Sequence, residues 1–81
     1  MLKLYPIKDI IRNMADIGRQ VQQLRKKARL TQMEFSRRVG VGLRFIRDLE
    51  QGKPTVRLDK VNQVLEFLGH HLEVVSNHDR K

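Results

Sequence analysis

The fold is decided by residues 31–52, which read TQMEFSRRVGVGLRFIRDLEQG. Thr31 can cap a helix, and Glu34 stands three positions later, which is the spacing of a capping box. We expect this helix to run to Val39 and to stop at Gly40, because glycine readily adopts the left-handed conformation that ends many helices. The first part of the stretch therefore predicts one short helix with both ends marked.

A second short helix is predicted to follow after a link of three residues, 40–42. It spans residues 43–51, with Gly52 as its stop, and Ile46 and Leu49 lie three positions apart on one face. Two short helices joined by so short a link must cross steeply. This is the helix-turn-helix geometry, which places the second helix in the major groove of DNA.

Helical patterns flank the pair on both sides. Residues 16–29 carry apolar residues three and four positions apart, at Ile17, Val21, Leu24 and Ala28. Residues 58–68 repeat this spacing before Gly69, and Pro54 separates them from the central pair. The sequence thus predicts an all-α, repressor-like fold of four to five compact helices.

The two ends carry shorter patterns. Residues 2–5 alternate like a strand, and Pro6 can open an additional helix through Met14. Residues 71–75 read HLEVV, which is rich in strand-forming residues and too short for a helix. We therefore divide the chain into an N-terminal extension (1–15), a helix-turn-helix domain (16–69), a C-terminal β-strand (70–76) and a polar tail (77–81).

Composition limits the class of protein. A chain of 81 residues with 40% hydrophobic residues can bury a single core. Seventeen Lys and Arg against nine Asp and Glu give a formal charge of +8, which favours a polyanionic partner, although charge alone does not separate DNA from RNA or an acidic membrane. There is no cysteine and no apolar run that spans a bilayer, so we expect a cytoplasmic protein.

An enzyme or a metal site is not expected. The three histidines, His70, His71 and His78, have no cysteine or well-placed carboxylate at the spacing of a metal site. No phosphate-binding loop or nucleophile motif occurs in the sequence either. The sequence predicts no cofactor.

The predicted second helix supplies the candidates for reading DNA bases. Opposite its apolar face lie Leu43, Arg44, Arg47 and Asp48. Arg44, near the helix start, is the best candidate for a bidentate contact with guanine, and Leu43 for contact with a thymine methyl group. Arg47 has three alternatives, a base contact, a phosphate contact or an ion pair with Asp48. Lys53, just past the helix, is a natural phosphate ligand.

The chain resembles the lambdoid-repressor and Cro type of helix-turn-helix domain, in the patterns LTQxEFSxxVG at residues 30–40 and IxxLExGK at residues 46–53. This resemblance implies that Gln32 touches the DNA backbone and that Glu50 pairs with Arg25. The chain departs from the family at Gly42, where Ser or Thr commonly caps the recognition helix. Glycine is an acceptable cap, but it offers no hydroxyl for a phosphate.

A homodimer is expected, because a single module of this size buries little surface on DNA and repressors of this size bind palindromic operators as dimers. The candidate interface is the predicted strand, with Leu72, Glu73, Val74 and Val75. A lone strand leaves its backbone donors and acceptors unpaired, and a second copy would supply partners. The alternative is pairing within the chain, with residues 2–5.

Residues 50–58 and 65–74 also look like those of HipB-type antitoxins, whose repressor-like core ends in a dimerisation strand. This resemblance implies a HipA-like Ser/Thr kinase toxin as partner, neutralised by complex formation, and autorepression of the shared operon. One alternative is a stand-alone phage-type or chromosomal repressor. Another is an interaction protein whose helix-turn-helix no longer binds DNA.

Overall fold

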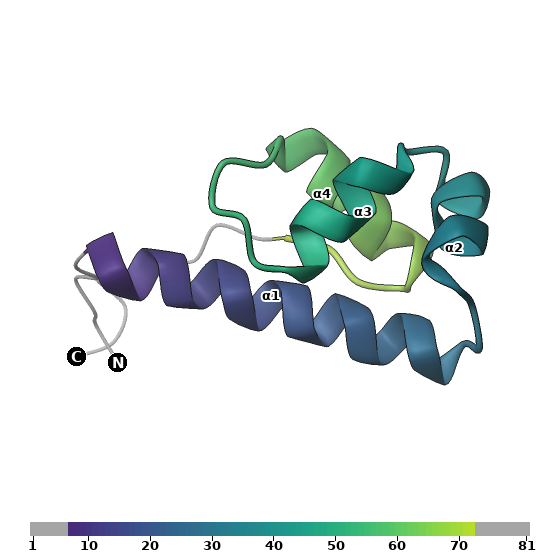
Figure 1. Ribbon diagram of the computed structural model, residues 1–81, viewed down its shortest axis with the longest axis horizontal. Coiled ribbons are helices and arrows are strands. Elements are labelled where there is room, and N and C mark those ends of the chain that lie inside the picture. Colours follow the sequence, from purple (N-terminus) through teal and green to yellow (C-terminus); the bar gives the residue numbers. More distant parts are fainter. Residues whose placement is uncertain (1–6, 73–81) are drawn as a thin grey trace.

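The computed structural model describes the backbone of residues 7–72 and the side chains of residues 14–72. This part of the chain forms four helices, in the order α1 (Ile7–Lys27), α2 (Gln32–Val39), α3 (Leu43–Glu50) and α4 (Leu58–Phe67). The three short helices gather beside the C-terminal part of the long α1, whose first turns extend past them (Figure 1). The four-helix arrangement agrees with the predicted all-α fold.

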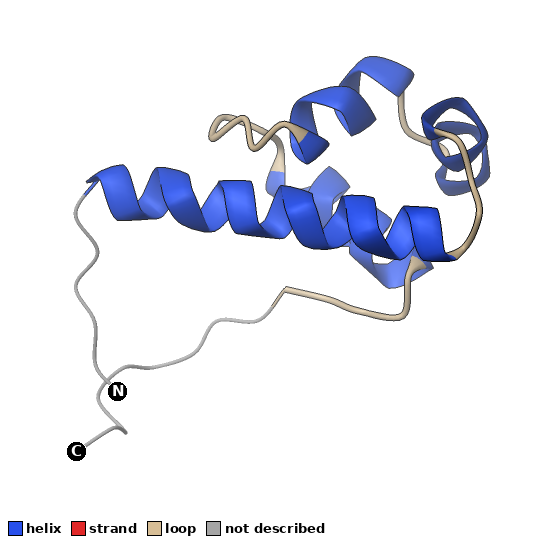
Figure 2. Cartoon of the chain, turned by 60° about the horizontal axis from the view of Figure 1, so that its bottom comes forward, coloured by secondary structure: helices blue, strands red, loops and turns tan. Residues whose placement is uncertain are grey.

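Figure 2 shows only helices and loops between residues 7 and 72. Within the predicted C-terminal strand (70–76), His70 and His71 are described and are not part of a strand, and the same holds for Leu72. The Leu72 backbone N–H donates to Asn62 Oδ1 at 2.9 Å. Glu73, Val74 and Val75 lie outside the described residues, as do residues 2–5, so the strand and its pairing remain predictions.

The first helix is longer than predicted. It begins at Ile7 instead of residue 16, and the separate N-terminal helix expected through Met14 is its first part. The physical reason is that no helix-stopping residue interrupts this stretch. The apolar spacing of three and four continues without a break, through Ile7, Ile10, Met14, Ile17, Val21 and Leu24. The predicted boundary between residues 15 and 16 therefore falls inside a helix.

The ends of α2 are those predicted. Thr31 Oγ1 accepts a hydrogen bond from the Glu34 N–H at 3.1 Å, and Glu34 Oε1 accepts one from the Thr31 N–H at 2.8 Å. This second bond is the main cause that lowers the pKa of Glu34 below its usual value. Gly40 ends the helix at φ 90°. Local signals alone therefore fix the length of α2.

A left-handed residue follows every one of the four helices of the described chain, at Arg29, Gly40, Gly52 and Gly69. After α1, the Arg29 N–H donates to the carbonyl of Lys26 and the Leu30 N–H to that of Arg25, which is the Schellman pattern. Arg29 adopts φ 61°. For a residue with a Cβ atom, this conformation costs about 1 kcal/mol relative to glycine.

The core is formed by side chains of all four helices and of the link between α2 and α3, at Val21, Phe35, Val41, Ile46, Leu49, Val61, Val64 and Leu65. Phe35 is fully buried, and its ring meets that of Phe67 at 5.8 Å in an edge-to-face arrangement. Phe67 remains partly exposed on α4. The short helices are thus held together by one shared apolar centre.

Two glycines allow α1 and the end of α3 to touch. Gly18 is buried in the middle of α1, and a Cβ atom there would overlap the carbonyl oxygen of Leu49 and lie 3.0 Å from that of Glu50. A Cβ atom at Gly52 would lie 2.8 Å from the Cα atom of Ala15. The depth at which α3 sits on α1 is therefore set by the absence of a side chain at Gly18.

Candidate nucleic-acid interface

The helix α3 has one buried and one exposed face. Ile46 and Leu49 are fully buried in the core, whereas Arg44 and Arg47 are exposed. The other two residues predicted to face DNA, Leu43 and Asp48, are half-buried. The structure therefore brings the predicted base-reading residues together on the outer side of a helix that is fixed from behind.

Gly42 lies at the start of α3 and is exposed to solvent. It has the extended conformation of a helix cap, with φ −69° and ψ 150°, and no side chain caps the helix. A Cβ atom at Gly42 would meet no atom within 4 Å. The glycine thus leaves the N-terminal turn of α3 open, so the backbone of this turn is accessible to a ligand.

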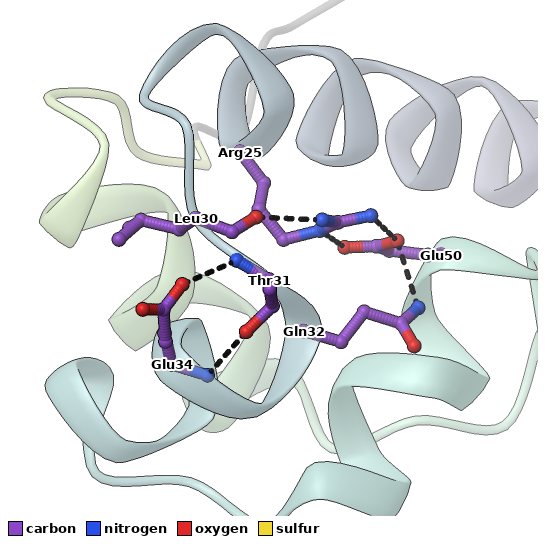
Figure 3. Close-up of polar contacts among 6 residues, drawn as sticks. All are labelled: Arg25, Leu30, Thr31, Gln32, Glu34 and Glu50. Carbon is purple, nitrogen blue, oxygen red and sulfur yellow. Dashed lines mark hydrogen bonds and ion pairs between the residues drawn. The ribbon is translucent and has the colours of Figure 1, made fainter.

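A buried ion pair fixes α3 from behind. Arg25 Nε donates to Glu50 Oε2 at 2.6 Å, and Arg25 Nη2 donates to Glu50 Oε1 at 3.0 Å (Figure 3). The two residues are only 7% and 8% exposed. Arg25 Nη1 also donates to the carbonyl of Leu30 at 2.8 Å. One guanidinium therefore ties α1 to the link before α2 and to the end of α3.

Gln32 joins the same network from the first turn of α2. Its Nε2 atom donates to Glu50 Oε1 at 3.0 Å, and its side chain is half-buried (Figure 3). An amide nitrogen carries two N–H groups, so Gln32 can bind Glu50 and one further acceptor at the same time. Glu50 in this way orients the side chain for which the family resemblance implies a contact with the DNA backbone.

Asp48 pairs with Lys53, and not with Arg47 as one alternative predicted. The distance between Lys53 Nζ and Asp48 Oδ2 is 3.5 Å. Neighbouring residues on a helix point in different directions, which disfavours an Arg47–Asp48 pair. By contrast, the turn after α3 folds Lys53 back, because its N–H donates to the carbonyl of Asp48 at 3.0 Å. A partly exposed pair of this kind is weak and can exchange for a phosphate.

Residues 16–76 match a family described as a helix-turn-helix domain. The chain belongs to the helix-turn-helix family. It is also 46% identical, over 71 residues, to a protein of Sinorhizobium fredii named as an uncharacterized HTH-type transcriptional regulator, y4mF. That similarity covers 88% of this chain and 93% of the relative. The chain thus resembles this relative over nearly its whole length.

Within the helix-turn-helix domain, α2 and α3 are the two helices of the motif, and α3 is the second one. The family match begins at Asp16, inside α1, so the part of α1 from Ile7 to Ala15 precedes it. Gly18 lies within the match, and apolar periodicity does not single it out, although a lone glycine inside a helical pattern can mark close packing. It is the residue that sets the position of α3.

Outside the α2–α3 surface, the described residues form small hollows beside α1. Two adjoining hollows, each of about 320 Å³, share Leu24 and Lys27. His70 lines one of them, and Phe67 at the end of α4 lines the other. The described side chains hold no group of three or more potential metal ligands. Among helices of the described residues, none has the length and apolar character needed to cross a membrane.

Proposed function

We propose that this chain is a sequence-specific DNA-binding repressor, which acts in the cytoplasm as a homodimer on palindromic operators. The observation that carries the proposal is the pair Arg44 and Arg47, exposed on a helix whose other face is buried and ion-paired to α1. A rigid helix with arginines on its outer face suits the major groove, where guanine presents two acceptors. The formal charge of +8 favours approach to DNA.

Each side chain has a distinct role in this proposal. Arg44, in the first turn of α3, donates to the O6 and N7 atoms of a guanine, and Leu43 beside it contacts a thymine methyl group. Gln32 and Lys53 donate to phosphates of the DNA backbone. Their bonds to Glu50 and Asp48 hold both side chains beside α3, next to the helix that enters the groove. Arg47 adds a phosphate contact on the same outer face.

The dimer follows from the size of the module. A palindrome with half-sites about 34 Å apart requires two copies related by a two-fold axis. Leu72 is half-buried against the core and its backbone N–H donates to Asn62, so the last described residue is anchored to α4. We assign residues 72–75 to the contact between the two copies, as the strand pattern predicts.

Changing Arg44 to Ala tests the proposal. We expect a loss of about 1–3 kcal/mol in binding to a duplex from the protein's own promoter, with little change for a random duplex, because a base contact carries specificity. Fluorescence anisotropy at fixed salt measures both affinities. Arg19→Ala, which removes the same charge from the exposed surface of α1, is the control. Equal losses on both duplexes would show that Arg44 does not read bases.

We further propose that the protein is the antitoxin of a HipA-like kinase toxin and represses their shared operon. The support is the resemblance of residues 50–58 and 65–74 to HipB-type antitoxins. Expression of the tagged chain from its native operon should yield a stoichiometric complex with a kinase. A DNA-binding protein that purifies alone, from an operon without a kinase gene, would favour the stand-alone repressor.

A further inference from the structure

Arg29, the left-handed residue after α1, has no role in the proposed function. Arg29 adopts φ 61°, whereas the other three helices of the described chain are followed by glycine at the equivalent position. The Arg29 side chain is exposed, and no hydrogen bond or ion pair within the described residues involves it. The chain therefore carries an arginine where glycine is easier to accommodate, and it gains no contact of its own from that arginine.

The position of Arg29 is fixed relative to α3. The next residue, Leu30, is held through its carbonyl by Arg25, which also binds Glu50 at the end of α3. Three positions after Arg29 comes Gln32, which binds the same carboxylate. The link between α1 and α2 (28–31) is therefore already ordered before a ligand binds. This lowers the entropic cost of a contact made from the link.

We propose that the Arg29 guanidinium binds a phosphate of the DNA backbone, next to the phosphate assigned to Gln32. The inference rests on the proposed DNA-binding function and adds a contact outside the two helices of the motif. A planar guanidinium is well suited to a phosphate, which it can engage through two parallel hydrogen bonds. The contact carries no sequence information, so it strengthens binding to all duplexes alike.

Arg29→Gly separates this role from a structural one, because its two expected effects have opposite signs. Relief of the left-handed conformation should raise Tm by about 4 °C. The loss of one phosphate contact per subunit should make the negative slope of log K against log salt shallower by about 0.9 per subunit. It should also weaken binding roughly tenfold, on operator and random duplexes alike. Arg29→Asn, which tolerates the same backbone conformation without the charge, should show the same loss of affinity.

The control is again Arg19→Ala, which removes one positive charge from the exposed surface of α1, where Arg19 pairs with Asp16, and should leave the salt slope unchanged. Salt titrations of duplex binding and thermal unfolding followed by circular dichroism give the readouts. If Arg29→Gly raises Tm but binds like Arg19→Ala, then Arg29 is only a tolerated surface residue and the inference fails. If the unaltered protein binds no duplex at low salt, the DNA-binding function fails with it.

Discussion

Gly18→Ala is expected to destabilise the protein by about 2–3 kcal/mol, although alanine normally favours a helix over glycine by about 1 kcal/mol. The added Cβ atom would overlap the carbonyl oxygen of Leu49, and a backbone atom cannot move aside as a flexible side chain can. The end of α3 must therefore shift away from α1. Thermal unfolding should show a fall in Tm of about 10–20 °C.

The matched control for Gly18→Ala is Gly42→Ser. Gly42 is exposed, has the backbone angles of a helix cap, and has open space at its Cβ position. Serine there can cap α3, so stability should rise by a few tenths of a kcal/mol, on the order of the known Ser–Gly difference at this position. If Gly18→Ala proves as stable as the unaltered protein, then the close contact of α1 with α3 does not set the fold.

Arg25→Met is the second change with a large expected effect, a loss of about 3–5 kcal/mol. Methionine fills much of the space of the arginine stem but leaves the Glu50 carboxylate buried, with Gln32 as its remaining side-chain donor among the described residues. The Leu30 carbonyl also loses the hydrogen bond from Arg25. Urea unfolding of the full chain gives the change in free energy.

The double change Arg25→Met with Glu50→Leu completes the test. Replacing both partners of a buried ion pair with apolar residues is often neutral or stabilising, so the double variant should recover most of the lost stability. It should nevertheless bind all duplexes more weakly, because Gln32 loses the carboxylate that orients it. A double variant no more stable than Arg25→Met alone would contradict the assignment of the cost to an unpaired buried charge.

The parts of the fold that sequence predicts well are those governed by neighbouring residues. Thr31, Glu34 and Gly40 predict both ends of α2 correctly, because a capping box and a left-handed glycine act within one or two turns of chain. The predicted start of α1 at residue 16 is wrong, because no local signal ends a helix between Met14 and the residues after it. Periodicity alone was the better guide there.

The site was less accessible to sequence, because it depends on contacts between distant segments. Gly18 meets the backbone of Leu49 and Glu50, which lie about thirty residues later in the chain. This close contact forms only when α3 packs on α1, and no pattern in the sequence of α1 specifies it. The partner of Asp48 depends on the turn that brings Lys53 back along α3. The Arg25–Glu50 pair was inferred from family resemblance, and helical spacing did not supply it.

The division of α3 into two faces has a consequence for how this protein can diverge. Arg44 and Arg47 are exposed and contribute little to folding, while Ile46, Leu49 and Glu50 carry the packing and the ion pair. On the proposed function, substitution of Arg44 can therefore change the preferred DNA sequence without loss of the scaffold. On the same proposal, a gene duplicate would acquire a new target sequence through its exposed residues, while the buried face of α3 keeps the domain folded.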